Sequence, residues 1–146
     1  MSFFIFLFIN LFHTSHPAVH PTVVQQATVK VKVTRVSSKK GEILAALFSS
    51  DKGFPDNASA AYKVARGTAV NGTATLEFSN VPKGTYAIAL FHDTNNDGEL
   101  NTNMLGIPKE GYGVSNNVKN LFSGPGYKQC AFQHSAETAL TIIMRY

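Results

Sequence analysis

The sequence contains only one cysteine, Cys130, so no disulfide can form within the chain. A nucleophilic thiol needs a histidine base and an orienting partner, and neither stands beside this residue. Its neighbours are Gln129, Ala131 and Phe132, which make a largely apolar setting. We therefore predict that Cys130 is a small buried residue and not a catalytic one.

The sequence also lacks a strong charge of either sign. Its 13 Lys and Arg residues outnumber its 9 Asp and Glu residues, which gives a formal net charge of +4. The basic residues are scattered, and the pair Lys39–Lys40 is their only cluster. Nucleic-acid-binding domains usually gather basic residues on one face or along one helix. We therefore predict that the chain has no nucleic-acid partner.

No apolar stretch is long enough to cross a bilayer, which takes about 20 residues. The longest stretch, Phe3–Phe12, is interrupted only by Asn10, and no charged residue precedes Lys30. Its length is that of the apolar region of a secretory signal peptide, although the basic residues that usually precede this region are missing. We predict a signal peptide here, and a buried N-terminal strand is the alternative.

The predicted signal peptide divides the chain into two parts. Residues 1–27 form the signal peptide and leader, with cleavage between Ser15 and Ala27, and residues 28–146 form a single domain. No cysteine directly follows the apolar stretch, which disfavours a lipid anchor. We therefore expect the mature chain to have no transmembrane span and to be exported, either to the periplasm or outside the cell.

No segment shows a sustained apolar period of 3.6 residues, which is the pattern of an amphipathic helix. Short strand-like stretches take its place. Val29, Val31 and Val33 alternate with polar residues, as in a half-buried strand. Residues 43–48 are apolar on both faces, which is typical of a central strand, and residues 85–91 predict another strand.

Turn signals separate these stretches. Asn71–Gly72 lies between the strand-like residues 61–70 and 73–78 and predicts a hairpin, because both central positions of such a turn need positive φ. Residues 81–84, Val-Pro-Lys-Gly, predict a second turn, and residues 139–146 form a last strand. The sequence therefore predicts an all-β fold: an antiparallel β-sandwich of about seven strands with one long loop.

The long loop covers residues 92–127, which have few strand signals and many Gly, Asn and Pro residues. Loops of more than about 15 residues without secondary structure are uncommon in compact domains and usually carry function or are braced. Three acidic residues gather at its start, and no Lys or Arg occurs between Lys83 and Lys109. This part of the chain therefore holds the candidate site.

The start of the loop follows the first half of a calcium-binding loop. With Asp93 as position one, an Asn stands at position three, an Asp at five and a Gly at six, where alternate side chains turn inward. Position twelve is Met104 in place of a bidentate glutamate, and no flanking helices are expected, so this is not an EF-hand. Oxygen ligands suit Ca²⁺ better than Zn²⁺. The predicted ligands of a weak Ca²⁺ site are Asp93, Asn95, Asp97, Glu99 and Asn101, with Glu99 acting through its backbone carbonyl.

An alternative reading of the same residues needs no metal. Asn, Asp and Gly side chains and backbones form polar turns in which the side chains accept hydrogen bonds from nearby backbone amides. The residue pattern is compatible with both structures.

Residues 91–117, FHDTNNDGELNTNMLGIPKEGYGVSNN, resemble a block found in a family of small exported bacterial proteins, the domain of unknown function 2141. Residues 46–55, 81–93 and 123–132 resemble other motifs of that family, so the resemblance covers about residues 28–146. Asn101 departs from the family pattern, which usually has Asp there, and the lost charge weakens any cation site. The resemblance implies an exported β-sandwich, transthyretin-like or more broadly immunoglobulin-like, with no established activity.

We predict that the chain is a non-catalytic binding or accessory module for a glycan, a peptide or an envelope protein. Exposed aromatic residues on glycine-rich loops suit sugar rings and peptides. The alternative is that these rings fill the end of the sandwich. The candidate ligand surface consists of His92, Glu110, Tyr112, Asn116, Phe122 and Tyr127.

Two other functions stay open. The resemblance to transthyretin-like folds brings hydroxyisourate hydrolases to mind, which end in Tyr-Arg-Gly-Ser, whereas this chain ends in Met144–Arg145–Tyr146. His92–Asp93, or Glu110 with His134, could form acid–base pairs, but no nucleophile signature accompanies them, so we do not expect an enzyme. The third function is an envelope protein that assembles through the edge of its long, apolar last strand.

Overall fold

The structure is a computed structural model and describes residues 25–119 and 124–146. Most of the predicted signal peptide and leader lies outside these ranges, and so does Phe122 of the predicted ligand surface. The first described strand begins at Gln26, two residues before the predicted start of the domain. No helix in the described ranges is long and apolar enough to cross a membrane.

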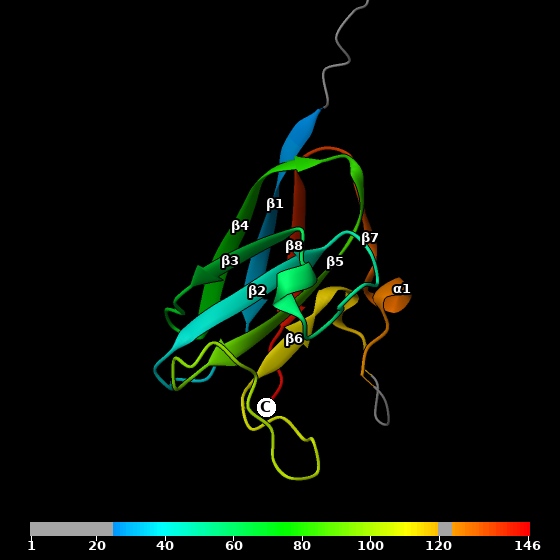
Figure 1. Cartoon of the computed structure of the whole chain (residues 1–146). Helices are drawn as coiled ribbons and strands as arrows, with labels where there is room; N and C mark the ends of the chain where they lie inside the picture. The colour runs from blue at the N-terminus through cyan, green and yellow to red at the C-terminus, as the bar shows by residue number, and fades with distance from the viewer. Residues whose placement is uncertain (1–24, 120–123) are drawn as a thin grey trace, which may run out of the picture.

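Two β-sheets stack face to face in the described part of the chain (Figure 1). One sheet has three strands in the order β4–β1–β8 and the other has five, in the order β3–β2–β5–β6 with β7 also paired to β5. The prediction of an all-β sandwich is confirmed. The strands of the first sheet are β1 (Gln26–Thr34), β4 (Thr73–Pro82) and β8 (Thr138–Ile143). Those of the second are β2 (Glu42–Phe48), β3 (Lys63–Gly67), β5 (Gly84–Asp93), β6 (Tyr112–Val114) and β7 (Phe132–His134).

One strand pair departs from the predicted antiparallel arrangement. The other pairs of strands run antiparallel, but β8 runs parallel to β1, with partners from Val29–Thr138 to Thr34–Ile143. Strand β8 is therefore reached from the five-stranded sheet by crossing over to the other layer. The connecting segments between strands contain the short helix α1 (Tyr127–Cys130) and two single 3₁₀ turns, Ala58–Ala60 and Ser115–Asn117.

The main hydrophobic core lies between the two sheets. The sequence of strand β1 shows how this core forms. Val29, Val31 and Val33 are buried, while Lys30 and Lys32 between them face solvent. Successive side chains of a strand point to opposite faces, so this alternation buries one face only. Similar inward positions from β2, β4, β5 and β8 complete a continuous apolar layer.

The Asn71–Gly72 turn forms as predicted, but the hairpin around it does not. Both residues have positive φ, 50° and 77°, and the flanking residues Val70 and Thr73 exchange backbone hydrogen bonds of 2.8 and 3.1 Å. Beyond this single bridge the chain separates, because β3 pairs with β2 whereas β4 pairs with β1 in the other sheet. The turn thus connects the two layers at one edge of the sandwich.

A second hydrophobic cluster covers half of the outer face of the five-stranded sheet. Phe48 of β2 lies in this cluster against the ring of Phe54, which in turn meets Tyr127 of α1. Cys130 is fully buried here, as predicted, and burial raises the pKa of its thiol to about 11. A thiol with this pKa is protonated at neutral pH and is a poor nucleophile.

The free edge of β8 is covered by side chains of the segment that follows β6. The Asn117 side-chain amide donates to the Thr141 carbonyl at 3.0 Å, and its oxygen accepts from the Ile143 amide at 2.8 Å. Asn117 therefore makes the pair of bonds that a neighbouring strand would make. This contact occupies the free edge of β8 at Thr141 and Ile143.

Candidate functional site: an apolar groove beside a braced loop

The predicted long loop is interrupted, because β5 extends to Asp93 and because β6 and the 3₁₀ turn Ser115–Asn117 lie within it. The longest irregular stretch in the described part of this loop is residues 94–111, which leave β5 and return to β6. We call these residues the finger, since they project from the end of the sandwich (Figure 1). The base, the middle and the tip of the finger are held in different ways.

The base of the finger is held by the buried carboxylate of Glu110. One of its oxygens, Oε1, accepts from the backbone amide and the hydroxyl of Thr94, at 2.8 and 2.9 Å. The other oxygen accepts from the backbone amide of Asn101 at 3.1 Å. Three donors from both sides of the finger therefore meet one charged acceptor, and hydrogen bonds to a charged group are stronger than neutral ones.

The acidic turn of residues 93–98 leads from the end of β5 into the finger. The buried carboxylate of Asp93 accepts from the backbone amides of Asp97, at 3.2 Å, and Gly98, at 2.9 Å. Gly98 has a φ of 79°, a conformation that L side chains rarely adopt. A carboxylate has about four lone-pair positions, so Asp93 keeps acceptor capacity after these two bonds.

Two side chains of this turn, Asn95 and Asp97, converge with that of Asn101. The side-chain amide nitrogen of Asn95 donates to Asp97 Oδ2 at 2.8 Å and to Asn101 Oδ1 at 2.9 Å. Asn101 also donates to Asp97 Oδ2 at 2.8 Å. These hydrogen bonds, Asn101 first, together with that from the Glu99 amide, lower the pKa of the Asp97 carboxyl. Oxygen atoms of residues predicted to bind a cation thus lie together here, and they accept hydrogen bonds from groups within residues 93–101.

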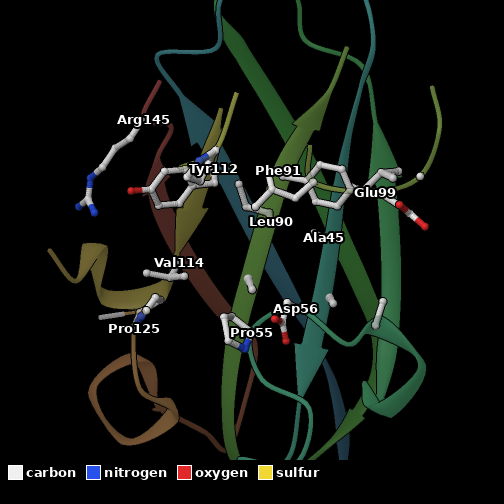
Figure 2. Close-up of a pocket in the computed structure, with 18 of the residues that line it drawn as sticks. Ala45, Pro55, Asp56, Leu90, Phe91, Glu99, Tyr112, Val114, Pro125 and Arg145 are labelled. Carbon is white, nitrogen blue, oxygen red and sulfur yellow. The ribbon is translucent and has the colours of Figure 1, made fainter. Parts of the chain in front are cut away.

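The donor set for a metal is therefore made of oxygens alone. Within residues 25–119 and 124–146, no three His, Cys, Asp or Glu side chains come together as a metal cluster. A cation at this turn would rely on the Asn95 and Asn101 amide oxygens beside the Asp93 and Asp97 carboxylates. The Glu99 side chain is exposed and lines the groove described below (Figure 2).

The tip of the finger is a small hairpin with apolar residues at its turn. The Asn103 side-chain oxygen accepts from the amides of Leu105 and Ile107, at 2.9 and 3.0 Å, and so fixes the turn. Met104 and Leu105 at the turn are exposed, and Ile107 beside them is largely exposed. The turn therefore presents apolar side chains to solvent on a defined backbone.

A groove of about 1160 Å³ lies on the open half of the outer face of the five-stranded sheet (Figure 2). Its floor is made of outward-facing residues of four strands, β3, β2, β5 and β6. One end is closed by residues 55–58, the opposite end by the finger, and one side by residues 124–125. The main floor residues are Leu44, Val64, Phe91 and Tyr112, and the groove borders the second hydrophobic cluster at Ala46, Ala89 and Val114.

Most of the side chains that line the groove are apolar. Among the described residues that line it there is no Asn, Gln, Ser, Thr or His side chain. The polar side chains that line the groove are Asp56, Arg66, Glu99, Tyr112 and Arg145. Arg145 is already engaged, because its guanidinium donates to the carbonyls of Val118 and Asn117, both at 2.6 Å. The groove therefore offers apolar contact on its floor and a few charges around it.

The predicted ligand surface is only partly assembled. Tyr112 lines the groove, whereas His92 and Glu110 are buried and not at the surface. The Nδ1 atom of His92 lies 2.8 Å from the Tyr146 hydroxyl, and burial lowers the pKa of its imidazole. His92 and Glu110 therefore brace the end of the sandwich next to the finger.

Asn116 and Tyr127 of the predicted ligand surface lie outside the groove. The Asn116 side chain donates to the carbonyls of Gln129 and Ala131, at 3.0 and 2.9 Å, and so fastens α1 to the end of β6. The Tyr127 hydroxyl donates to the Thr85 carbonyl at 3.0 Å, and its ring belongs to the second hydrophobic cluster. Both residues have structural partners that explain their positions.

The acid–base pairs drawn from the sequence are not assembled. Glu110 lies at the end of β5 beside Thr94, whereas His134 pairs with Gly84 at its start. Ten strand residues at about 3.3 Å each separate these positions by roughly 30 Å. His92 and Asp93 are adjacent in one strand, so their side chains point to opposite faces of the sheet.

The groove floor was missed in the sequence, although a signal for it exists. Residues 43–48 and 85–91 are apolar on both faces, which requires cover on the outer side of the sheet. Loop cover extends over Phe48 but not over Leu44 or Phe91. Nothing local in the sequence says where that cover ends.

The chain matches a bacterial protein family over residues 31–142, described as "Uncharacterized protein conserved in bacteria (DUF2141)". The match spans most of the chain, so the protein belongs to this family, as its motifs indicated. No curated protein and no solved structure matches the chain. The family carries no stated activity, and a function must be argued from the groove and the finger.

Proposed function

We propose that this protein is an exported, non-catalytic binding module whose groove takes an apolar segment of a peptide or protein partner. We further propose that Ca²⁺ stabilises the finger that closes one end of that groove. The observation that carries the proposal is the groove itself, with its apolar floor on a rigid sheet and charges at its margin. Binding sites are commonly concave, largely apolar and provided with a few polar groups that orient the ligand.

The composition of the groove favours a peptide over a glycan. A sugar presents many hydroxyl groups, and each one that is buried without a hydrogen-bond partner is unfavourable by roughly 1–3 kcal/mol. The described lining has no amide or hydroxyl side chain apart from the Tyr112 phenol. Apolar peptide side chains need no such partners, and the charges of Asp56, Glu99 and the two arginines suit a peptide that carries both signs.

A binding experiment tests this preference. Protein exported from a bacterial host that expresses the full chain would be screened in parallel against fluorescent apolar peptides and a glycan array. Val64→Glu puts a charge on the groove floor at a side chain that is already 67% exposed. Val70→Glu is the matched control, since Val70 is 69% exposed and does not line the groove.

We expect peptide binding that Val64→Glu weakens by tenfold or more, while Val70→Glu binds like the unaltered protein. Binding of glycans alone, or equal loss in both variants, would contradict the groove as a peptide site.

The calcium proposal depends on the convergent side chains of Asn95, Asp97 and Asn101. Rotating the Asn95 side-chain amide by 180° places its oxygen where the nitrogen now meets Asp97 and Asn101. Oxygens of these three residues would then surround one point next to the Asp93 carboxylate. Few charges in the shell imply weak binding, with a Kd of about 10⁻⁴ to 10⁻³ M, as in extracellular modules.

Thermal melts with and without Ca²⁺ test this site. At a Ca²⁺ concentration ten times Kd, binding stabilises the fold by about 1.4 kcal/mol and raises the melting temperature. Asp97→Asn should abolish this increase, whereas Asp51→Asn, at an exposed acid far along the chain, should keep it. Identical melts of the unaltered protein in calcium and in chelator would retire the metal and leave the groove proposal intact.

Export is proposed from the apolar N-terminal stretch, and the fold adds a constraint on cleavage. Gln26 pairs with Pro82 at the start of β1, so cleavage before Gln26 keeps the whole strand. N-terminal sequencing of protein from the periplasm should begin between His16 and Gln26. Recovery of an intact Met1 from that compartment would contradict cleavage.

A further inference from the structure

Large apolar side chains of the finger are unusually exposed to solvent. Met104 and Leu105 are 104% and 83% exposed, and Ile107 is 55% exposed. These three residues lie within four positions of one another, on a hairpin that Asn103 fixes through hydrogen bonds. Single exposed apolar residues are ordinary, but a contiguous exposed group marks an interaction site.

The finger and the groove form one continuous surface. Leu105 and Ile107 line the groove at the end that the finger closes, and the apolar floor of the sheet begins beside them. A twofold-symmetric interface must be self-complementary, with the same surface contributed by both subunits. A chain that carries an apolar projection next to an apolar groove meets this requirement.

Charge placement supports one relative orientation of two copies. Figure 2 shows Arg145 beside Tyr112 at the finger end of the groove and Asp56 beside Pro55 at the opposite end. A twofold axis parallel to the sheet face and perpendicular to its strands brings the Arg145 end of each copy onto the Asp56 end of the other. Arg145 of each copy then lies toward Asp56 of the other, whereas Glu99, also at the finger end, lies on the other side of the groove from Arg145 (Figure 2). The attraction between Arg145 and Asp56 favours this register over others.

We propose that the groove of this protein is occupied by the finger of a second copy, in a reciprocal dimer. This inference rests on the proposed function, since it names the apolar segment that the groove takes. Each finger places Met104 and Leu105 over the sheet floor of its partner, near Val64. Both exposed apolar surfaces are thereby removed from water, which is the main driving force of association.

Sedimentation velocity over a range of protein concentrations tests the dimer with the full chain exported and processed by a bacterial host. We expect a reversible monomer–dimer equilibrium for the unaltered protein. A finger variant, Met104→Ser with Leu105→Ser, and a groove variant, Val64→Glu, should each weaken dimerisation by tenfold or more. These side chains are exposed in the monomer, so neither variant should disturb folding, and Val70→Glu serves as the control.

Mixing the two variants separates reciprocal exchange from other dimers. The finger variant keeps an intact groove, and the groove variant keeps an intact finger, so their heterodimer regains one of two contacts. The mixture should therefore associate more strongly than either variant alone. A dimer that forms equally well with Val64→Glu, or a mixture no stronger than its components, would overturn the proposal.

The outcome is distinguishable from a failure of the proposed function. A protein that stays monomeric at every concentration but binds apolar peptides in a Val64-dependent manner overturns the self-association alone. A monomer that binds no apolar peptide overturns both. A dimer lost in both variants and partly restored by mixing supports both.

Discussion

The outer face of the five-stranded sheet has two halves with similar strand residues and different surroundings. In one half, Phe48 is fully buried under Phe54, with ring centroids 5.3 Å apart at an edge-to-face angle, and Tyr127 lies beyond. In the other half, Leu44 and Phe91, which pair across β2 and β5, line an open groove. The strands are apolar throughout, so the difference is made by loops. One half is thus a second core, and the other is an open groove with an apolar floor.

The greatest loss of stability is expected from a substitution in the covered half of the sheet face. Phe48→Ala should lower the free energy of unfolding by about 3–5 kcal/mol, because a fully buried ring is removed and its neighbours close the space only in part. Val64→Ala in the open half should change it by no more than about 0.5 kcal/mol. Urea denaturation of both variants gives the comparison. Equal losses would show that the two halves do not differ as described.

The next largest loss of stability is expected at Glu110, which holds the finger at one end of the groove. Glu110→Gln keeps the shape of the side chain but replaces a charged acceptor of three hydrogen bonds, and it puts an NH₂ group toward a backbone amide. The expected loss is about 1–3 kcal/mol, with faster hydrogen exchange at the finger amides. Glu77→Gln, at an exposed carboxylate of β4, is the control. Unchanged exchange in the finger would show that Glu110 does not hold it.

A smaller loss of stability is expected from a change at Tyr127, which lies in the second hydrophobic cluster. Tyr127→Phe keeps the ring against Phe54 but removes the hydroxyl that donates to the Thr85 carbonyl. The expected loss is about 1 kcal/mol, which is typical for one hydrogen bond. Tyr62→Phe, at a tyrosine that is 43% exposed, should lose less. Thermal melts of the two variants side by side would decide, and a larger loss for Tyr62→Phe would contradict this assignment.

The smallest expected effect is a pH dependence at the end of the sandwich next to the finger. Burial lowers the folded-state pKa of His92 below its ordinary value of about 6.5. As pH falls below that value, the unfolded chain takes up a proton that the folded protein does not, so stability decreases toward the lower folded pKa. Urea midpoints at pH 7 and pH 5 should show this decrease, and His92→Gln should reduce it. An identical slope in that variant would assign the effect elsewhere.

The acidic turn contributes at lower pH and can be separated from His92. Hydrogen bonds lower the pKa of Asp97, so its contribution is present above the ordinary carboxyl value and is lost as pH falls through the folded pKa. The loss at Asp97 begins below the ordinary carboxyl value, whereas the loss at His92 begins below the ordinary imidazole value.

The strands were predictable because their signals are local. The alternation of Val29, Val31 and Val33 predicted a half-buried strand, and residues 43–48, apolar on both faces, predicted a central strand. Asn71–Gly72 predicted its turn, because positive φ at two successive positions is a property of those residues. Its flanking strands joined different sheets, because strand partners are set by contacts that are distant in sequence.

The candidate site divides in the same way. The D-x-N-x-D-G pattern determined the polar turn, since a short Asp or Asn side chain reaches the amides of its own turn and a glycine permits its bend. The burial of Glu110 and His92 depended on Thr94, Asn101 and Tyr146 arriving from other parts of the chain.

By itself, the sequence determined the family, the all-β class, the main strands and the place of the acidic turn. These depend on residue type and on side-chain alternation over a few positions. The tertiary structure alone decided which half of the outer sheet face is covered, where the groove lies and that the finger tip is exposed. Burial of a face is a property of what packs on it, and the packing partner comes from elsewhere in the chain.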